Sequence, residues 1–93
     1  SDLKNEKNWK VIKNHHLNKT FKFKDFKQAL NFTNKIGITA QEKNHHPEII
    51  LNYGKVEVNL RTHKKNSITK KDYELAQEID NLLKKEGRRH NWN

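Results

Sequence analysis

The sequence predicts an α+β fold, a four-stranded antiparallel sheet with helices packed on one face. The prediction rests on the order of two hydrophobic periodicities along the chain. Apolar residues alternate in two early segments, follow a helical spacing, alternate again in a hairpin, and then return to a helical spacing. A chain of 93 residues has room for one such core, so we expect residues 1–93 to form a single domain.

Two short strands are expected near the N-terminus. Trp9, Val11 and Ile12 indicate the first strand. Phe21 and Phe23, which alternate with lysines, indicate the second. We expect the polar residues 15–19 to connect these strands as a solvated turn, although they include a His-His pair. The aromatic side chains of this region are more typical of a core or an interface than of ligand stacking.

A helix is expected from Asp25 onward, because the spacing of the apolar residues changes to three and four. The residues at this spacing are Phe26, Ala29, Leu30, Thr33 and Ile36. Asp25 is placed to cap the helix, with Gln28 three residues later. We expect Gly37 to end it.

The clearest hairpin signal lies between residues 49 and 62. Ile49, Leu51 and Tyr53 alternate, and a second alternating run follows after a turn at residues 52–55. That second run consists of Val56, Val58, Leu60 and Thr62. Side chains alternate across a strand, so the polar face is expected to carry Glu57, Asn59, Arg61 and His63, with His63 at the end of the strand.

The last predicted element is a helix from Thr69 to about Lys85. Asp72 stands at the capping-box position, and three apolar residues follow it at helical spacing: Ala76, Ile79 and Leu83. We expect Gly87 to end this helix and residues 88–93 to form a mobile tail.

The charge of the chain does not by itself indicate a nucleic-acid partner. The formal net charge is +9, from 17 lysines and 3 arginines against 11 acidic residues. The lysines are scattered along the sequence, whereas a nucleic-acid interface gathers basic residues on one face. We therefore expect no nucleic-acid partner.

Other features of composition bear on location and assembly. No apolar run approaches the length of a membrane helix, no secretory leader is recognisable, and cysteine is absent. We expect a cytoplasmic protein without a membrane partner. Hydrophobic residues make up only 31% of the chain and charged residues 33%, so we expect an oligomer that buries additional apolar surface.

Histidines carry the clearest chemical signal. His45 and His46 precede Pro47, and His63 follows at the end of the predicted hairpin. Imidazole exchanges protons near neutral pH, so these residues predict a proton-transfer site. Pro47 disfavours a helical conformation at His46 and so favours an extended backbone that presents both rings.

Two alternatives stay open at this point. The His45-His46 pair also fits an exposed polar loop before a strand. The three histidines could instead be metal ligands, but this hypothesis ranks lower because adjacent side chains on an extended chain point in different directions and no paired ligand spacing is present.

The motif around these histidines resembles the pterin-4a-carbinolamine dehydratases. The resemblance rests on residues 42–48 (EKNHHPE), the spacing from Tyr53 to His63, and Asp72. It extends over nearly the whole chain, through Trp9, residues 21–26, Ala29, Phe32 and the helix from Thr69 to Leu83.

The resemblance implies a cofactor-free hydro-lyase. Its substrate would be a 4a-hydroxytetrahydropterin, which loses water to give the quinonoid dihydropterin in tetrahydrobiopterin recycling. It further implies a homodimer or homotetramer, and a functional link to an aromatic amino-acid hydroxylase. A non-catalytic binding module or transcriptional cofactor on the same fold is the alternative.

Residue roles follow from the same resemblance. His45 and His63 are the acid/base candidates, and His46 binds the substrate and assists proton removal. Pro47 and Thr62 would line the pocket with them.

Two further positions, Gln41 and Asp72, bear on the expected site. Asp72 would support the site, although it is equally typical of a helix cap. The resemblance leads us to expect an acidic residue at position 41, so Gln41 replaces a carboxylate that could orient or charge a histidine.

Overall fold

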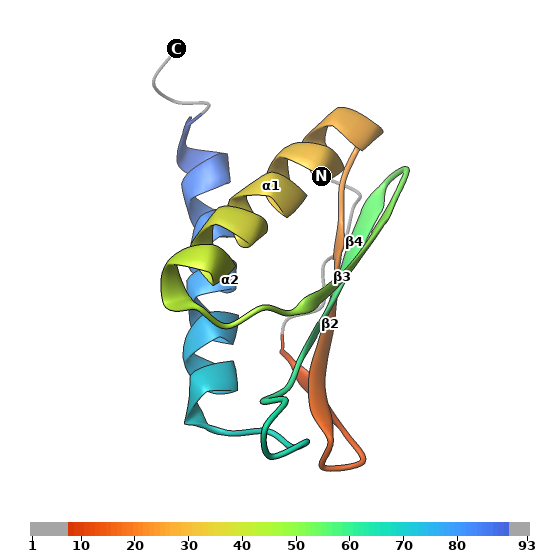
Figure 1. Cartoon of the computed structure of the whole chain (residues 1–93). Coiled ribbons are helices and arrows are strands. Elements are labelled where there is room, and N and C mark those ends of the chain that lie inside the picture. The colour runs from red at the N-terminus through yellow and green to blue at the C-terminus, as the bar shows by residue number, and fades with distance from the viewer. Residues whose placement is uncertain (1–7, 90–93) are drawn as a thin grey trace.

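The fold consists of four strands and two helices in a computed structural model that describes residues 8–89 (Figure 1). The elements are β1 (Lys10–Ile12), β2 (His16–Lys22), α1 (Phe26–Lys43), β3 (Glu48–Asn52), β4 (Lys55–Leu60) and α2 (Lys70–Arg89). The sheet has the order β1-β2-β4-β3, and every neighbouring pair is antiparallel. The predicted element order and sheet are confirmed.

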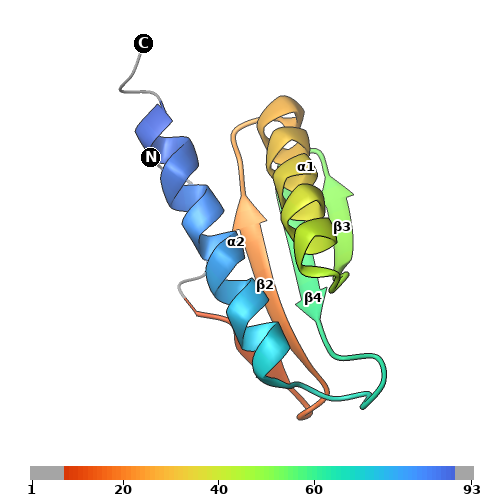
Figure 2. The ribbon, with the colours of Figure 1, turned by 60° about the vertical axis from the view of Figure 1, so that its left-hand side comes forward.

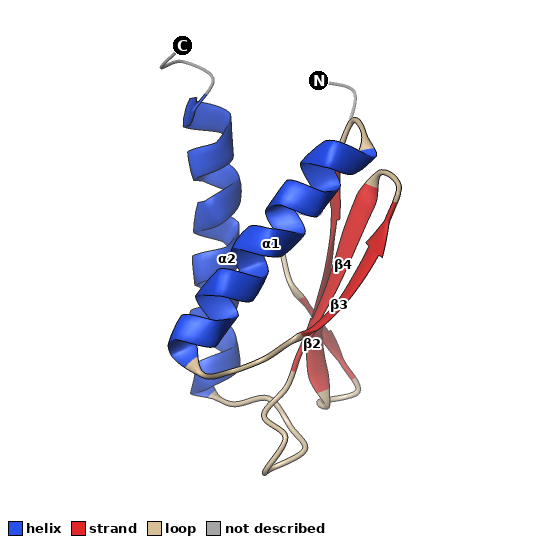
Figure 3. Cartoon of the chain, turned by 45° about the horizontal axis from the view of Figure 1, so that its top comes forward, coloured by secondary structure: helices blue, strands red, loops and turns tan. Residues whose placement is uncertain are grey.

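Both helices cover the same face of the sheet. In Figure 2 α1 lies in front of β3 and β4, and α2 lies in front of β2. Figure 3 shows the two layers edge on, with the helices on one side and the strands on the other. The opposite side of the sheet carries no element among the described residues, and we call it the open face. Neither helix among these residues is long and apolar enough to cross a membrane.

The core lies between the two layers because apolar residues occupy alternate positions of the central strands. Leu17 and Phe21 of β2 and the valines of β4 are completely buried against α1 and α2. The core residues are Leu17, Phe21, Ala29, Phe32, Ile36, Ala40, Val56, Val58, Leu60, Leu75, Ala76 and Ile79. Trp9 and Phe23 pack against this core, in agreement with the structural role expected for the aromatic residues.

One lysine occupies an inward position of β2. Lys19 is buried between Leu17 and Phe21, and its Nζ lies 2.9 Å from Oδ1 of Asp80 on α2. The indole Nε1 of Trp9 also donates to the Asp80 carboxylate, at 3.2 Å. A buried charge needs such a partner, so this cluster fastens α2 to β2 and to the residue that precedes β1.

The expected loop at residues 15–19 is wrong, because β2 already begins at His16. Leu17 is buried while Asn18 faces the other side of the sheet, so the segment has strand alternation. The connection is a tight turn in which Lys13 and Asn14 have φ of 53° and 55°. The polar composition of residues 15–19 made their strand alternation difficult to recognise in the sequence.

The expected end of α1 at Gly37 is also wrong. The helix continues to Lys43, because Ile36 and Ala40 extend its buried stripe while Gly37 lies on the exposed side. It ends at Asn44, whose left-handed backbone (φ 54°) lets its N–H reach the carbonyls of Ala40 and Gln41. Gly87 likewise lies inside α2. The tail expected at residues 88–93 is helical at 88 and 89, and the rest lies outside the described residues.

Replacing Gly37 with Ala should stabilise the protein. A Cβ built at this position meets no atom within 4 Å, and a glycine inside a helix costs about 0.5–1 kcal/mol relative to alanine. We expect the free energy of unfolding of G37A, measured by urea denaturation, to rise by that amount. If Gly37 marked a helix end, the substitution would bring no gain.

Candidate active site

The connection from α1 to β3 turns two adjacent imidazoles to opposite sides of the sheet. Asn44 ends the helix, and the N–H of His45 donates to the Ala40 carbonyl at 3.1 Å. The extended segment that follows leads into β3 at Glu48. His45 points into the helical layer and contacts Asp72, whereas His46 reaches a pocket on the open face.

Asp72 in the first turn of α2 is the centre of a buried polar network. Its carboxylate is completely buried and accepts from His45 Nε2 at 2.6 Å. Its second oxygen accepts from Thr62 Oγ1 and from the backbone N–H of Thr69, each at 2.9 Å. The two threonine hydroxyls are themselves 2.6 Å apart. One side chain therefore ties the end of β4, the start of α2 and the histidine loop together.

The network also defines how His45 is presented. A carboxylate only accepts hydrogen bonds, so the proton of the contact lies on Nε2 of His45. A neutral His45 then has its lone pair on Nδ1, as an imidazole does when a carboxylate orients it. The His45 side chain is 12% exposed, so the ring is held from the core side.

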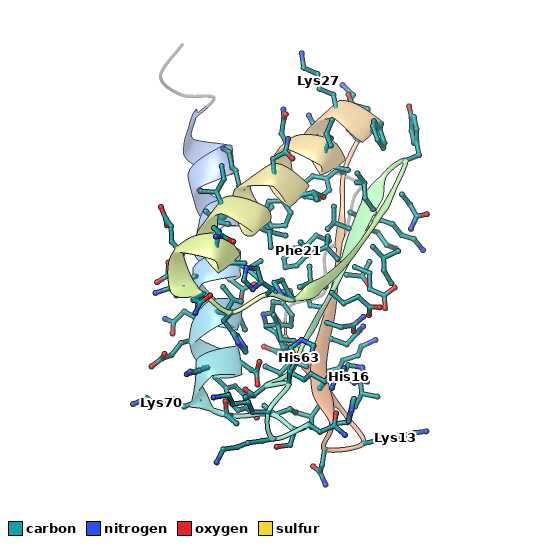
Figure 4. All side chains as sticks on the ribbon, viewed as in Figure 1. Lys13, His16, Phe21, Lys27, His63 and Lys70 are labelled. Carbon is teal, nitrogen blue, oxygen red and sulfur yellow. The ribbon has the colours of Figure 1, made fainter. Side chains whose placement is uncertain are left out.

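The pocket on the open face has a volume of about 370 Å³, which is within the range of small-molecule sites. It is lined by His15, His16, His46, Glu48, Asn59, Arg61 and His63. Figure 4 shows His16 and His63 close together at one end of the sheet, where β2 begins and β4 ends. The site therefore combines four imidazoles with one guanidinium and one carboxylate.

A ladder of side-chain hydrogen bonds crosses the open face beside the pocket. Asn18 Nδ2 donates to Asn59 Oδ1 at 2.7 Å and to Glu57 Oε2 at 2.9 Å. Asn59 Nδ2 donates in turn to Glu48 Oε1 at 2.9 Å. These bonds link β2, β4 and β3, and they hold the polar wall of the pocket in place.

The structure separates the residues proposed for the site into two groups. His46 and His63 line the pocket, whereas His45, Thr62 and Asp72 belong to the buried network. Pro47 is half-buried and is not among the lining residues.

One histidine of the pocket also contacts α1. Gln41 Oε1 lies 2.9 Å from Nε2 of His46, so this glutamine orients the ring.

The metal alternative gains no support from the structure. Within residues 8–89 no group of three potential ligands is placed to hold a metal ion.

Sequence reasoning missed five of the lining residues. His15 and His16 were expected to lie in a solvated turn, and the structure places both in the pocket. Asn59 and Arg61 were expected only on the polar face of their strand, and Glu48 only within the motif of residues 42–48. The available signal was alternation, because a buried Leu17 places His16 on the open face, as buried valines place Asn59 and Arg61 there.

Comparison with known proteins points to one family. Residues 1–82 match the model of the family described as pterin 4 alpha carbinolamine dehydratase. A relative named for this dehydratase from Alkaliphilus metalliredigens is 47% identical over 72 residues, covering 77% of this chain and 65% of the relative. Another, from Sulfurisphaera tokodaii, is 46% identical over 82 residues, covering 88% of this chain and 87% of the relative.

Solved structures agree with the fold. A crystal structure described as a transcriptional coactivator/pterin dehydratase from Brucella melitensis has a TM-score of 0.77 and 31% identity, with 82% of each chain covered. A pterin dehydratase-like protein, described as a RuBisCO assembly factor in the alpha-carboxysome, has a TM-score of 0.65 at 19% identity, with 88% of this chain and 89% of that chain covered. The second likeness concerns the fold alone.

The chain thus has the four-stranded antiparallel sheet and the two helices of a pterin dehydratase fold. It belongs to the pterin-4-alpha-carbinolamine dehydratase family.

Removing the carboxylate at the centre of the buried network should destabilise the fold. Asp72→Ala leaves three donors without their acceptor, and an unsatisfied buried polar group costs about 1–3 kcal/mol. We expect the free energy of unfolding to fall by about 3 kcal/mol in urea denaturation. Glu74→Ala, an exposed change on the same helix, is the control and should alter it by less than about 0.5 kcal/mol. Equal stability of the two variants would contradict the central role of Asp72.

Proposed function

We propose that the protein is a hydro-lyase that dehydrates 4a-hydroxytetrahydropterins to quinonoid dihydropterins. The observation that carries the proposal is the hydrogen bond of His45 to Asp72, at 2.6 Å. His45 is next in sequence to His46, which lines a ligand-sized pocket with His63. Family membership supports the same substrate class. The physiological role we propose is tetrahydrobiopterin recycling, downstream of an aromatic amino-acid hydroxylase.

The proposed reaction needs two proton transfers. An acid protonates the 4a-hydroxyl group while the C4a–O bond breaks, and water leaves. The N5 lone pair forms the C4a=N5 double bond, and a base takes the N5 proton. The substrate thus loses one water molecule without redox change, and general acid–base catalysis is sufficient for this chemistry.

Three histidines supply the proposed groups. His63 is exposed in the pocket and is the acid/base candidate that contacts the substrate directly. His45 is the second candidate, acting through the Nδ1 atom that its bond to Asp72 leaves available. His46, oriented by Gln41, binds the pterin ring and assists proton removal, and Pro47 and Thr62 maintain the backbone around the two rings.

Loss of His63 should abolish most of the catalysis. The rate of 4a-hydroxytetrahydropterin dehydration, followed by ultraviolet absorbance, should exceed the spontaneous rate in the intact protein. A positioned acid or base contributes about 10²–10⁴-fold, so His63→Ala should lower kcat by at least about a hundredfold. Lys64→Ala, at the next position of the same exposed loop, should keep the full rate.

No acceleration by the intact protein would overturn the proposal. In that case the alternative is a binding module or transcriptional cofactor on this fold. The description of the Brucella melitensis protein as a transcriptional coactivator/pterin dehydratase is the observation that favours testing it.

We also propose that the chain forms a homodimer or homotetramer. Large apolar side chains are exposed on α1 and on the β3–β4 hairpin, including Ile38 at 61% and Tyr53 at 71%. Exposed apolar surface of this kind favours association. Light scattering at micromolar concentration should give at least twice the chain mass of 11.2 kDa, and a monomer would contradict the proposal.

A further inference from the structure

A chain of side-chain hydrogen bonds joins the loop after β4 to the turn before β2. Arg61 Nη1 donates to Oδ1 of Asn66, and His15 Nε2 lies 3.1 Å from the same oxygen. His15 Nδ1 lies 3.0 Å from Nδ1 of His16. This series of hydrogen bonds therefore ends at the imidazole ring of His16, which lines the pocket.

The direction of each bond follows from the groups that can donate. A guanidinium only donates, so Asn66 presents its oxygen, and His15 Nε2 must carry a proton to bond to it. A neutral His15 with this tautomer accepts at Nδ1, so Nδ1 of His16 is the donor. A neutral His16 then has an unprotonated Nε2, for which the described residues supply no hydrogen-bond partner.

His16 lies across the pocket from His46. Continuing the strand registers, by one residue from the Leu17–Leu60 pair and by two residues from the Glu48–Asn59 pair, places Arg61 between the two histidines. Neighbouring strands are about 4.8 Å apart, so the backbones of His16 and His46 are about 10 Å apart. His63 lines the pocket with both His16 and His46, so a flat bicyclic ring held against His46 and His63 turns its far edge, and a substituent there, toward His16.

We propose that His16 is a specificity residue, whose Nε2 accepts a hydrogen bond from a hydroxyl group on the side chain of a bound pterin. The proposal rests on the proposed function, because that function places the pterin ring beside His46 and His63. His15 and Asn66 are positioning residues that hold His16 in the accepting tautomer. A pterin with only a methyl substituent offers no donor to this nitrogen.

The test compares the binding of two fluorescent oxidised pterins with the same ring. One carries a dihydroxypropyl side chain and the other a methyl group, and fluorescence titration gives the Kd of each. One neutral hydrogen bond corresponds to about tenfold in affinity, so the intact protein should bind the hydroxylated pterin about tenfold more tightly.

Two substitutions separate the two nitrogens of His16. His16→Asn keeps an amide near Nδ1 that can donate to His15 but has no atom at the Nε2 position, so it should bind both pterins equally. His16→Gln reaches the Nε2 position with an acceptor oxygen and should keep most of the preference. Lys13→Ala changes the exposed turn beside His16 and should leave both Kd values unchanged.

Three results would overturn the proposal: no binding of either pterin by the intact protein, equal affinity for both, or the same preference in His16→Asn. Parallel dehydration assays distinguish this failure from failure of the proposed function. Catalysis without a side-chain preference would refute only the role of His16. A preference that depends on His16, without catalysis, would refute only the hydro-lyase activity. Melting curves of both His16 variants check that each is folded.

Discussion

The structure around the site depends on one buried carboxylate. Asp72 is completely buried, yet each of its oxygens accepts a hydrogen bond, and the donors come from three separate segments. Burial of a carboxylate is costly unless its hydrogen bonds are satisfied. These hydrogen bonds therefore fix how the segments that carry His45, Thr62 and Thr69 pack against one another. The same contacts position the pocket-lining residues that are next to them in sequence.

The strand period explains how one short motif serves both layers of the fold. Adjacent residues of an extended chain point to opposite faces. His45 is directed into the helical layer, where its Nε2–H donates to Asp72, and His46 lines the pocket on the open face while Gln41 of α1 contacts its Nε2. The same period brings Arg61 to the open face and Thr62 to the buried network. In each pair of sequence neighbours, the buried residue positions the backbone of the residue that lines the pocket.

Much of the fold could be predicted because its periodicities are clear. Val56, Val58 and Leu60 alternate without interruption, and they form the buried side of β4. The prediction failed where a single residue type was given too much weight. Gly37 was taken as a helix end, but the stripe of Ile36 and Ala40 continues past it, and tertiary burial outweighs the propensity of one glycine.

The site was predictable only where it coincides with a known motif. His46 and His63 were expected from their spacing, whereas His15 and His16 come from a distant part of the chain. They join the pocket because β2 pairs with β4 in the register that aligns Leu17 with Leu60. Registers of this kind depend on long-range pairing. The alternation around Leu17 indicates which face His16 occupies, but not which strand lies beside it.

Helix α2 is held by side-chain contacts at two positions along its length, and these contacts link the stability of the fold to the geometry of the site. Asp72 fastens its first turn to the histidine loop, and Asp80, about two turns later, pairs with the buried Lys19 and with Trp9. Sliding or rotation of the helix would break both sets of charged contacts together. Because each buried charge is costly without its partner, the second cluster restrains the helix that carries Asp72. The precision of the site thus depends on contacts of Trp9 and of Lys19 in β2, outside the histidine motif.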